Sequence, residues 1–210
     1  MSPKVRAALM DAPEFRVLRA LDRPRKVQDF VNRIPVNKER GRETCTSPLV
    51  TLRRNKAHCM EGALLAALAL WMHGHRPLIL DLKTTAVDVD HLVALFRVDG
   101  YWGGVTKTNH AVLRYREPIY RNMRELAVSY FHEYFMNNGA KTLRQYSEPF
   151  DLRKWNGDWM TADDDLWDLE RAIDRSPHHE LISRKQIAGL RKADKMVLAR
   201  AANAFGLTKE

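Results

Sequence analysis

The chain has 210 residues, 45% of them hydrophobic, which is enough for one substantial core, and its formal net charge at pH 7 is +9. It contains no apolar run of about eighteen residues, which excludes an ordinary membrane-spanning helix. Its two cysteines, Cys45 and Cys59, are too few for a disulfide framework. Residues 1–6 lack the pattern of a signal peptide, so we expect a reduced, cytoplasmic protein.

The N-terminal part of the chain predicts short helices. One or two amphipathic helices are expected within residues 3–34, the second around residues 26–33. A polar loop should follow over residues 37–46. A Ser-Pro pair then opens residues 47–54 and is typical of an N-cap and first helical position, so a short helix is expected there.

Cys59 stands in the first turn of a strongly apolar predicted helix over residues 59–72, which stops at Gly74. A thiol in that position is close to unpaired backbone N–H groups and to the positive end of the helix dipole, and both favour the thiolate. Basic side chains just upstream act in the same direction: Arg53, Arg54 and Lys56. Cys59 is therefore a candidate nucleophile. The alternative is a buried structural thiol, the usual role of a cysteine in an apolar stripe.

His91 is the candidate base. Residues 77–82 are typical of a buried strand, and a polar loop over residues 83–90 leads to a second strand that begins at His91. The Cys59 helix would run roughly 20 Å, and the strand would return over roughly 20 Å. His91 should therefore lie near the helix end that carries Cys59, where an imidazole could accept the thiol proton. The alternative is a strand-edge histidine with a structural role.

Residues 91–107 predict a hairpin. Asp99-Gly100 is typical of a two-residue type I′ turn between strands of alternating or apolar character. This turn would place His91 opposite Thr108. Gly103-Gly104 could introduce a bulge, which would shift the register by one residue.

A third catalytic residue, which would fix the tautomer of the His91 imidazole, should come from residues 106–109. This window contains no carboxylate. Asn109 has the side-chain acceptor and donors best suited to hold a ring N–H, while Thr106 and Thr108 are weaker candidates. The alternative for Asn109 is a role as a turn or cap residue.

The C-terminal half predicts more helix. A helix should begin at Glu117-Pro118 and end near Asn138-Gly139. Residues 140–160 are typical of irregular cover with room for a further edge strand. The segment Thr161-Ala162-Asp163-Asp164-Asp165 should cap a helix that runs to Asp174, and a basic helix should span residues 183–205.

These elements predict an α+β fold, in which the cysteine-bearing helix packs on a small antiparallel sheet with N- and C-terminal helices on its flanks. We expect a core domain over residues 1–160, including the N-terminal helices. A helical extension over residues 161–210 should pack on that core.

Several segments carry a resemblance to a known family: Ala57 to Ala63, Asp90 to Phe96, the strand of Trp102, Arg25 to Phe30, and Lys107 to Pro118. Over roughly residues 25–152 the chain resembles the transglutaminase-like, papain-fold superfamily, and more narrowly an uncharacterised group of bacterial transglutaminase-like proteins. The resemblance implies a papain-like core with Cys59 as the nucleophile and His91 as the base. Many relatives place an Asp on the strand after the His, where this chain has Thr106 and Lys107.

Residues and resemblance together predict thiol-dependent acyl transfer or amide hydrolysis on a peptide, a protein or a small amide. Cys59 would attack the carbonyl, with its backbone N–H in an oxyanion hole, and His91 would carry the proton. The candidate substrate-binding residues, each of which also has a structural alternative, are His58, Trp102, Thr106 and Arg114. No cofactor is expected, because an acetyltransferase-like use of coenzyme A would need a phosphate-cradling glycine loop that the sequence lacks. His178-His179 has no cysteine or carboxylate at metal-ligand spacing, so no metal is expected either.

The contrasting hypothesis is an inactive transglutaminase-like fold that serves as a peptide- or nucleic-acid-binding module. The predicted final helix carries much of the surplus positive charge, on Arg184, Lys185, Arg191, Lys192, Lys195 and Arg200. Such a stripe suits acidic partners. The interleaved aromatic and basic residues of many nucleic-acid binders are missing, which disfavours nucleic acid. Arg114 could hold a carboxylate or phosphate of a substrate. The sequence does not fix an oligomeric state.

Overall fold

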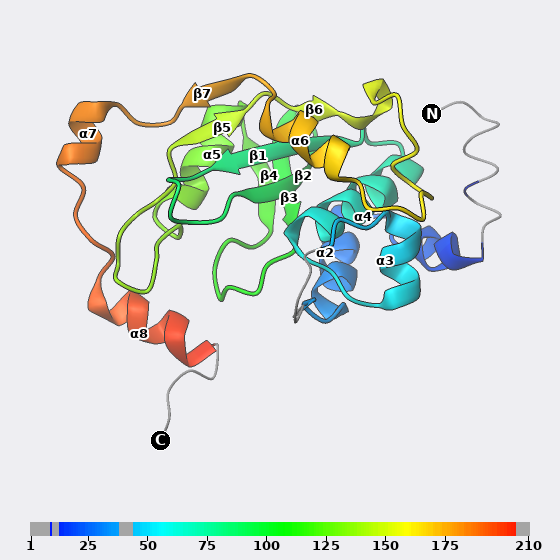
Figure 1. Ribbon diagram of the computed structural model, residues 1–210, viewed down its shortest axis with the longest axis horizontal. Helices are drawn as coiled ribbons and strands as arrows, with labels where there is room; N and C mark the ends of the chain where they lie inside the picture. Colours follow the sequence, from blue (N-terminus) through cyan, green and yellow to red (C-terminus); the bar gives the residue numbers. More distant parts are fainter. Residues whose placement is uncertain (1–8, 10–12, 38–43, 205–210) are drawn as a thin grey trace.

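The fold is built on an antiparallel sheet with helices on both faces (Figure 1). The computed structural model describes residue 9, residues 13–37 and residues 44–204. In this part of the chain, seven strands form one sheet in the order β4-β3-β2-β1-β5-β7, and β6 also pairs with β1. The strands are β1 (Leu78–Lys83), β2 (His91–Val98), β3 (Tyr101–Thr106), β4 (Arg116–Tyr120), β5 (Gln145–Ser147), β6 (Phe150–Asp151) and β7 (His178–Glu180).

The described helices are mostly short. They are η1 (Glu14–Ala20), α2 (Pro24–Arg33), α3 (Pro48–Arg54), α4 (Cys59–Met72), α5 (Met123–Phe131), η2 (Leu152–Lys154), α6 (Trp167–Asp174), α7 (Arg184–Ala188) and α8 (Lys195–Ala204). Among them, none combines the length and the apolar character that crossing a membrane requires. Figure 1 shows α2, α3 and α4 grouped together, while α7 and α8 lie at the opposite end of the molecule.

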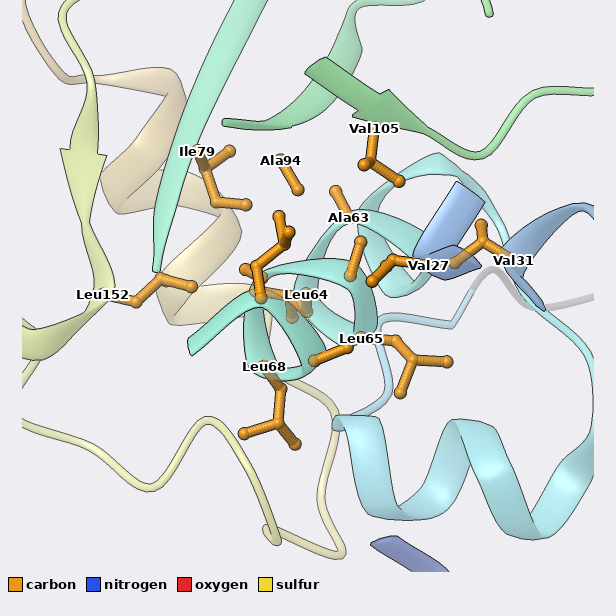
Figure 2. Close-up of a cluster of buried hydrophobic side chains, with 14 of the residues drawn as sticks. Val27, Val31, Ala63, Leu64, Leu65, Leu68, Ile79, Ala94, Val105 and Leu152 are labelled. Atoms are coloured by element: carbon orange, nitrogen blue, oxygen red, sulfur yellow. The ribbon is translucent and has the colours of Figure 1, made fainter. Parts of the chain in front are cut away.

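Helix α4 is the centre of the larger core. All of its residues from Met60 to Leu70 are buried, as expected for a helix that is apolar on every side. Figure 2 shows Ala63 and Leu64 of α4 near the sheet residues Ile79, Ala94 and Val105, with Val27 and Val31 of α2 on another side. The predicted helix over residues 59–72 is confirmed at both ends. The predicted short helix with Ser47 as its N-cap is also confirmed, because the Ser47 side chain accepts a hydrogen bond from the backbone of Val50.

The second face of the sheet is covered by α5. Leu126, Ala127 and Tyr130 of α5 belong to the same buried cluster as Val93 and Leu95 of β2. Leu92 and Ala94, which alternate with them along β2, belong to the cluster around α4. Successive side chains of a strand point to opposite faces. Alternate side chains of β2 therefore pack toward α4 and toward α5.

The hairpin has the predicted turn. Val98 pairs with Tyr101 across a two-residue turn, in which Asp99-Gly100 has positive φ at both positions (50° and 86°). The bulge that Gly103-Gly104 could introduce does not occur between β2 and β3, whose register is continuous. The irregularity lies on the other side of β3, between Trp102 and Gly104 where β4 pairs. The pairing that His91 was predicted to make with Thr108 lies beyond the end of β3.

The prediction of a helix from Glu117-Pro118 to Asn138-Gly139 is wrong at both ends. Residues 116–120 form β4, an edge strand, where a proline costs no ladder hydrogen bond. Helix α5 begins only after Asn122, whose side chain accepts a hydrogen bond from the Glu125 backbone, and it ends at Phe131.

The C-terminal part also differs from prediction. Strand β7 pairs with β5, so the expected helical extension over residues 161–210 contributes a strand to the sheet, and His178-His179 lies on that strand. Helix α6 starts at Trp167, so its first-turn acids are Asp168 and Glu170. The predicted basic helix over residues 183–205 is divided into α7 and α8. Its predicted end at Phe205, like residues 1–6 and most of the loop 37–46, lies outside the described residues.

Gly62 is an interior residue of α4 and gives the first testable prediction. A Cβ at Gly62 would lie 2.2 Å from the Cβ of Lys107, so the helix and the chain after β3 approach each other too closely for a side chain. Alanine is a better helix former than glycine by about 1 kcal/mol, but overpacking a core costs about 1–3 kcal/mol. We expect Gly62→Ala to lower the free energy of unfolding measured by urea denaturation.

Gly189 provides the control, because its φ of −97° is accessible to alanine and its Cβ would have no neighbour closer than 3.7 Å. Gly189→Ala should change the stability by less than about 0.5 kcal/mol. Equal effects of the two substitutions would contradict a steric role for Gly62.

Candidate functional site

The N-terminus of α4 is anchored by the buried carboxylate of Glu61. Its Oε1 atom accepts hydrogen bonds from Thr44 Oγ1 (2.8 Å) and from the backbone N and Oγ1 of Thr46 (3.1 and 2.9 Å). Its Oε2 atom accepts from the backbone N of His58 at 2.8 Å, as in a capping box. Glu61 therefore ties the loop before α3 to the first turn of α4, and so fixes the position of Cys59.

Cys59 is half-buried and borders two cavities. The smaller cavity, of about 240 Å³, is also lined by His91, Lys107 and Asn109. The larger cavity, of about 1050 Å³, extends from Cys59 toward Asp81 on β1. The thiol thus lies where two spaces of different size meet.

The Cys59 thiol is protonated at rest. Burial raises its pKa above the ordinary value, and the negative charge of Asp81 acts in the same direction. Backbone N–H groups of Met60, Leu92 and Cys59 itself lower the pKa, but burial is the larger effect. The helix-start position therefore provides the expected amide groups without providing a thiolate.

His91 is buried and neutral. Burial lowers its pKa to about 4, with a further contribution from His110. Its Nε2 atom has no hydrogen-bond partner among the described residues. His91 has the same strand parity as Val93, so its side chain belongs to the face of the sheet that α5 covers. It reaches the same cavity as Cys59 at the end of the sheet, but the described residues include no hydrogen bond between the two side chains.

Two of the other predicted residues also line a cavity. Asn109 is exposed in the turn after β3 and lines the smaller cavity. No hydrogen bond from Asn109 to the His91 ring is found in the described part of the chain. His58 occupies the N-cap position of α4 and lines both cavities.

The remaining three predicted residues lie outside both cavities, and each has a structural contact. Thr106 is buried, and its Oγ1 donates to the carbonyl of Leu113 at 2.7 Å. Trp102 is half-buried with the Arg97 guanidinium 5.3 Å from its ring centre. Arg114 is exposed and donates to the His110 carbonyl at 2.8 Å.

A pair that the sequence did not indicate, Asp81 and His178, lies near the larger cavity. His178 Nε2 is 3.1 Å from Asp81 Oδ2, and its Nδ1 is 2.6 Å from the carbonyl of Ser176. A carbonyl can only accept, so Nδ1 carries a hydrogen, and one further proton must be shared between Nε2 and Asp81. Burial and the charge of Asp90 raise the pKa of Asp81 to about 6, although His178 opposes this rise. The two residues are 97 positions apart, so no local spacing could have connected them.

The described geometry therefore gathers Cys59, His91, His58 and Asn109 around one cavity. No protein-family model matches the chain, and no curated protein matches it. The chemistry of the site follows from its own contacts, charges and burial.

The neutral state of His91 predicts a pH dependence of stability. Its folded pKa of about 4 is below the ordinary value of 6.5, so between these pH values the unfolded chain binds a proton that the folded chain does not. Stability should therefore fall as the pH falls, by about 2 kcal/mol between pH 7 and pH 4.5 from this group. Urea denaturation at both pH values should show a smaller loss in His91→Asn than in wild type. Parallel losses would mean that His91 is not held neutral by the fold.

The Glu61 network predicts a second effect on stability. In Glu61→Gln one carboxylate oxygen becomes an NH₂ group, which would face a hydrogen-bond donor instead of accepting from it. Leaving such donors unsatisfied in the core costs about 1–3 kcal/mol. Urea denaturation should show this loss, while Glu117→Gln on the exposed side of β4 should stay within about 0.5 kcal/mol of wild type. A Glu61→Gln protein as stable as wild type would show that the network does not anchor α4.

Proposed function

We propose that this chain is a thiol-dependent acyl-transfer or amide-hydrolysing enzyme of the transglutaminase-like, papain-fold type, with Cys59 as the nucleophile and His91 as the base. One observation carries the proposal. Cys59 at the start of a buried helix and His91 at the start of a neighbouring strand line the same cavity. A cysteine helix packed on an antiparallel sheet is consistent with a papain-like core.

The charge states favour general-base catalysis over a preformed thiolate–imidazolium pair. A neutral imidazole with an unpartnered Nε2 can accept a proton, and it is present in that form at every pH well above 4. His91 takes the Cys59 proton while Sγ forms its bond to the substrate carbonyl carbon. The carbonyl oxygen becomes an oxyanion, which the backbone N–H groups at the sulfur would stabilise.

The intermediate then collapses. The bond from carbon to the leaving group breaks, the leaving amine or thiol takes the proton back from the imidazolium, and an acyl-thioester remains on Cys59. Water or a second amine attacks this ester, with His91 again as the base, and frees the thiol. Because Cys59 and His91 are not hydrogen-bonded at rest, substrate binding must bring them into line, as often happens in catalytic sites.

The cavities favour a peptide-sized substrate. A volume of about 1050 Å³ is at the upper end of ordinary ligand sites. The wall of the larger cavity carries Asp81 and Asp90 but also Lys83, Arg144 and Arg184, so its charge does not select between acidic and basic substrates. Asn109, which lines the smaller cavity with His91, stays the candidate for the residue that orients the imidazole.

One observation favours a second candidate, a binding module that retains the cleft without catalysis. The Cys59 thiol has a raised pKa, and no hydrogen bond in the described residues joins it to His91. An inert thiol in an open cleft is what such a module would have. The two candidates differ in whether Cys59 forms a covalent acyl intermediate.

Acylation by 4-nitrophenyl acetate separates them. The background is Cys45→Ser, since Cys45 is buried with a pKa raised to about 12 and is not part of the proposal. We expect one acetyl group on Cys59 by intact mass and peptide mapping, and steady release of nitrophenolate. Cys59→Ala should lose both, and His91→Asn should react about 10²–10⁴-fold more slowly.

Three outcomes would contradict the enzyme proposal or part of it. Unaltered acylation in His91→Asn would remove His91 as the base. Labelling of Cys59 by iodoacetamide, without any acetylation, would favour the binding module. Acetylation that persists in Cys59→Ala would place the reaction elsewhere. Circular dichroism of each variant would exclude unfolding as the cause.

A further inference from the structure

Three carboxylates converge in the wall of the larger cavity. They belong to Asp81 on β1, Asp90 just before β2, and Asp174 at the end of α6. One ligand atom of each lies within 4.8 Å of the others. Because β1 and β2 pair antiparallel with Leu82 opposite His91, the end of β1 and the start of β2 are adjacent, and α6 brings the third residue.

Each carboxylate is held through one of its two oxygens. His178 Nε2 lies 3.1 Å from Asp81 Oδ2. The backbone N and Oγ1 of Thr84 donate to Asp90 Oδ1 at 2.7 and 2.9 Å. The Lys83 ammonium lies 2.6 Å from Asp174 Oδ1. Such outer contacts orient carboxylates toward a common ligand and are typical of metal sites.

The second carboxylate oxygen of Asp81 is buried without a partner in the described part of the chain, and this points to a ligand. The Asp81 side chain is only 3% exposed, and its Oδ1 atom has no hydrogen-bond partner among the described residues. A buried carboxylate oxygen without a partner is costly, and native proteins usually supply one.

The chemistry of the cluster selects the ligand. Three carboxylates face the Lys83 ammonium and the one proton shared between Asp81 and His178, so the ionised cluster keeps an excess of negative charge. All the available donors are oxygens, and both ring nitrogens of His178 already have partners. Oxygen donors alone favour hard divalent cations over zinc or copper.

We propose that Asp81, Asp90 and Asp174 bind a hard divalent cation, of the class of Ca²⁺, Mg²⁺ or Mn²⁺, with water completing the coordination. The sequence led us to expect no metal, because the three residues are brought together only by folding. The site shares the larger cavity with Cys59, but the proposal does not require the proposed acyl transfer, and its test uses no substrate.

The test is titration of the metal-free protein with Mn²⁺, Ca²⁺ and Mg²⁺ separately, followed by calorimetry and, for Mn²⁺, by electron paramagnetic resonance. We expect one bound ion per chain for at least one of the three, and a rise in Tm that EDTA reverses. Asp81→Asn and Asp174→Asn should each weaken binding by about tenfold or more. The matched control is Asp164→Asn, which changes the net charge equally at an exposed residue outside the cluster and should bind like wild type.

Lys83→Met adds a measurement that a purely structural ion pair would not explain. Removing the ammonium leaves Asp174 free for the cation, so the affinity should increase although the ion pair with Asp174 is lost. Thermal unfolding of each metal-free variant would confirm that it folds. The proposal is overturned if none of the three cations binds at millimolar concentration. It is also overturned if Asp81→Asn binds as wild type does, or if Asp164→Asn weakens binding as much as Asp81→Asn.

Discussion

The placement of one buried carboxylate, Glu61, is the constraint on which the site depends. Helix α4 is enclosed by apolar contacts on every side, and such contacts alone do not fix how far the helix slides or rotates. Glu61 fixes the position of α4, because its carboxylate accepts four hydrogen bonds from the loop before α3 and from His58, and these can all be made in only one position of the helix. Gly62 adds a second restraint by admitting Lys107 at a distance that any side chain would prevent. Cys59 is therefore positioned by the long-range contacts that its sequence neighbours Glu61 and Gly62 make.

The same burial decides the electrostatics of the thiol. Backbone N–H groups around the sulfur favour the thiolate, yet removing the charged form from water costs more, and the pKa rises. His91 follows the same rule in the opposite sense, because burial disfavours the imidazolium. Two neutral groups at one cavity can exchange a proton only when an electrophile stabilises the resulting charges. The resting state thus stores no reactive thiolate, and reactivity would depend on the substrate.

Sequence patterns predicted what neighbouring residues determine. The ends of α4, the Ser47 cap and the Asp99-Gly100 turn all depend on contacts a few residues apart, and all are confirmed. Long-range contacts escaped prediction. The expected lengths of the helix and the strand place His91 at the correct end of the sheet, but strand parity assigns its side chain to the face of α5. Pro118 suggested the start of a helix. It lies instead in an edge strand, and the local sequence does not reveal the pairing of that strand with β3.

Three strands of the sheet each place a buried polar residue at the same end of the sheet, while Asp151 is buried at the opposite end. Asp81 near the end of β1, His91 at the start of β2 and Thr106 at the end of β3 are buried, whereas the rest of these strands is apolar toward α4 and α5. Antiparallel pairing brings these strand ends together, and the first residue of α4 lines the same cavity as His91. Backbone pairing continues through the apolar part of the sheet, and this part packs between α4 and α5. Both proposed sites, the thiol and the carboxylate cluster, use this end because it is where strands stop and side chains can turn toward a cavity.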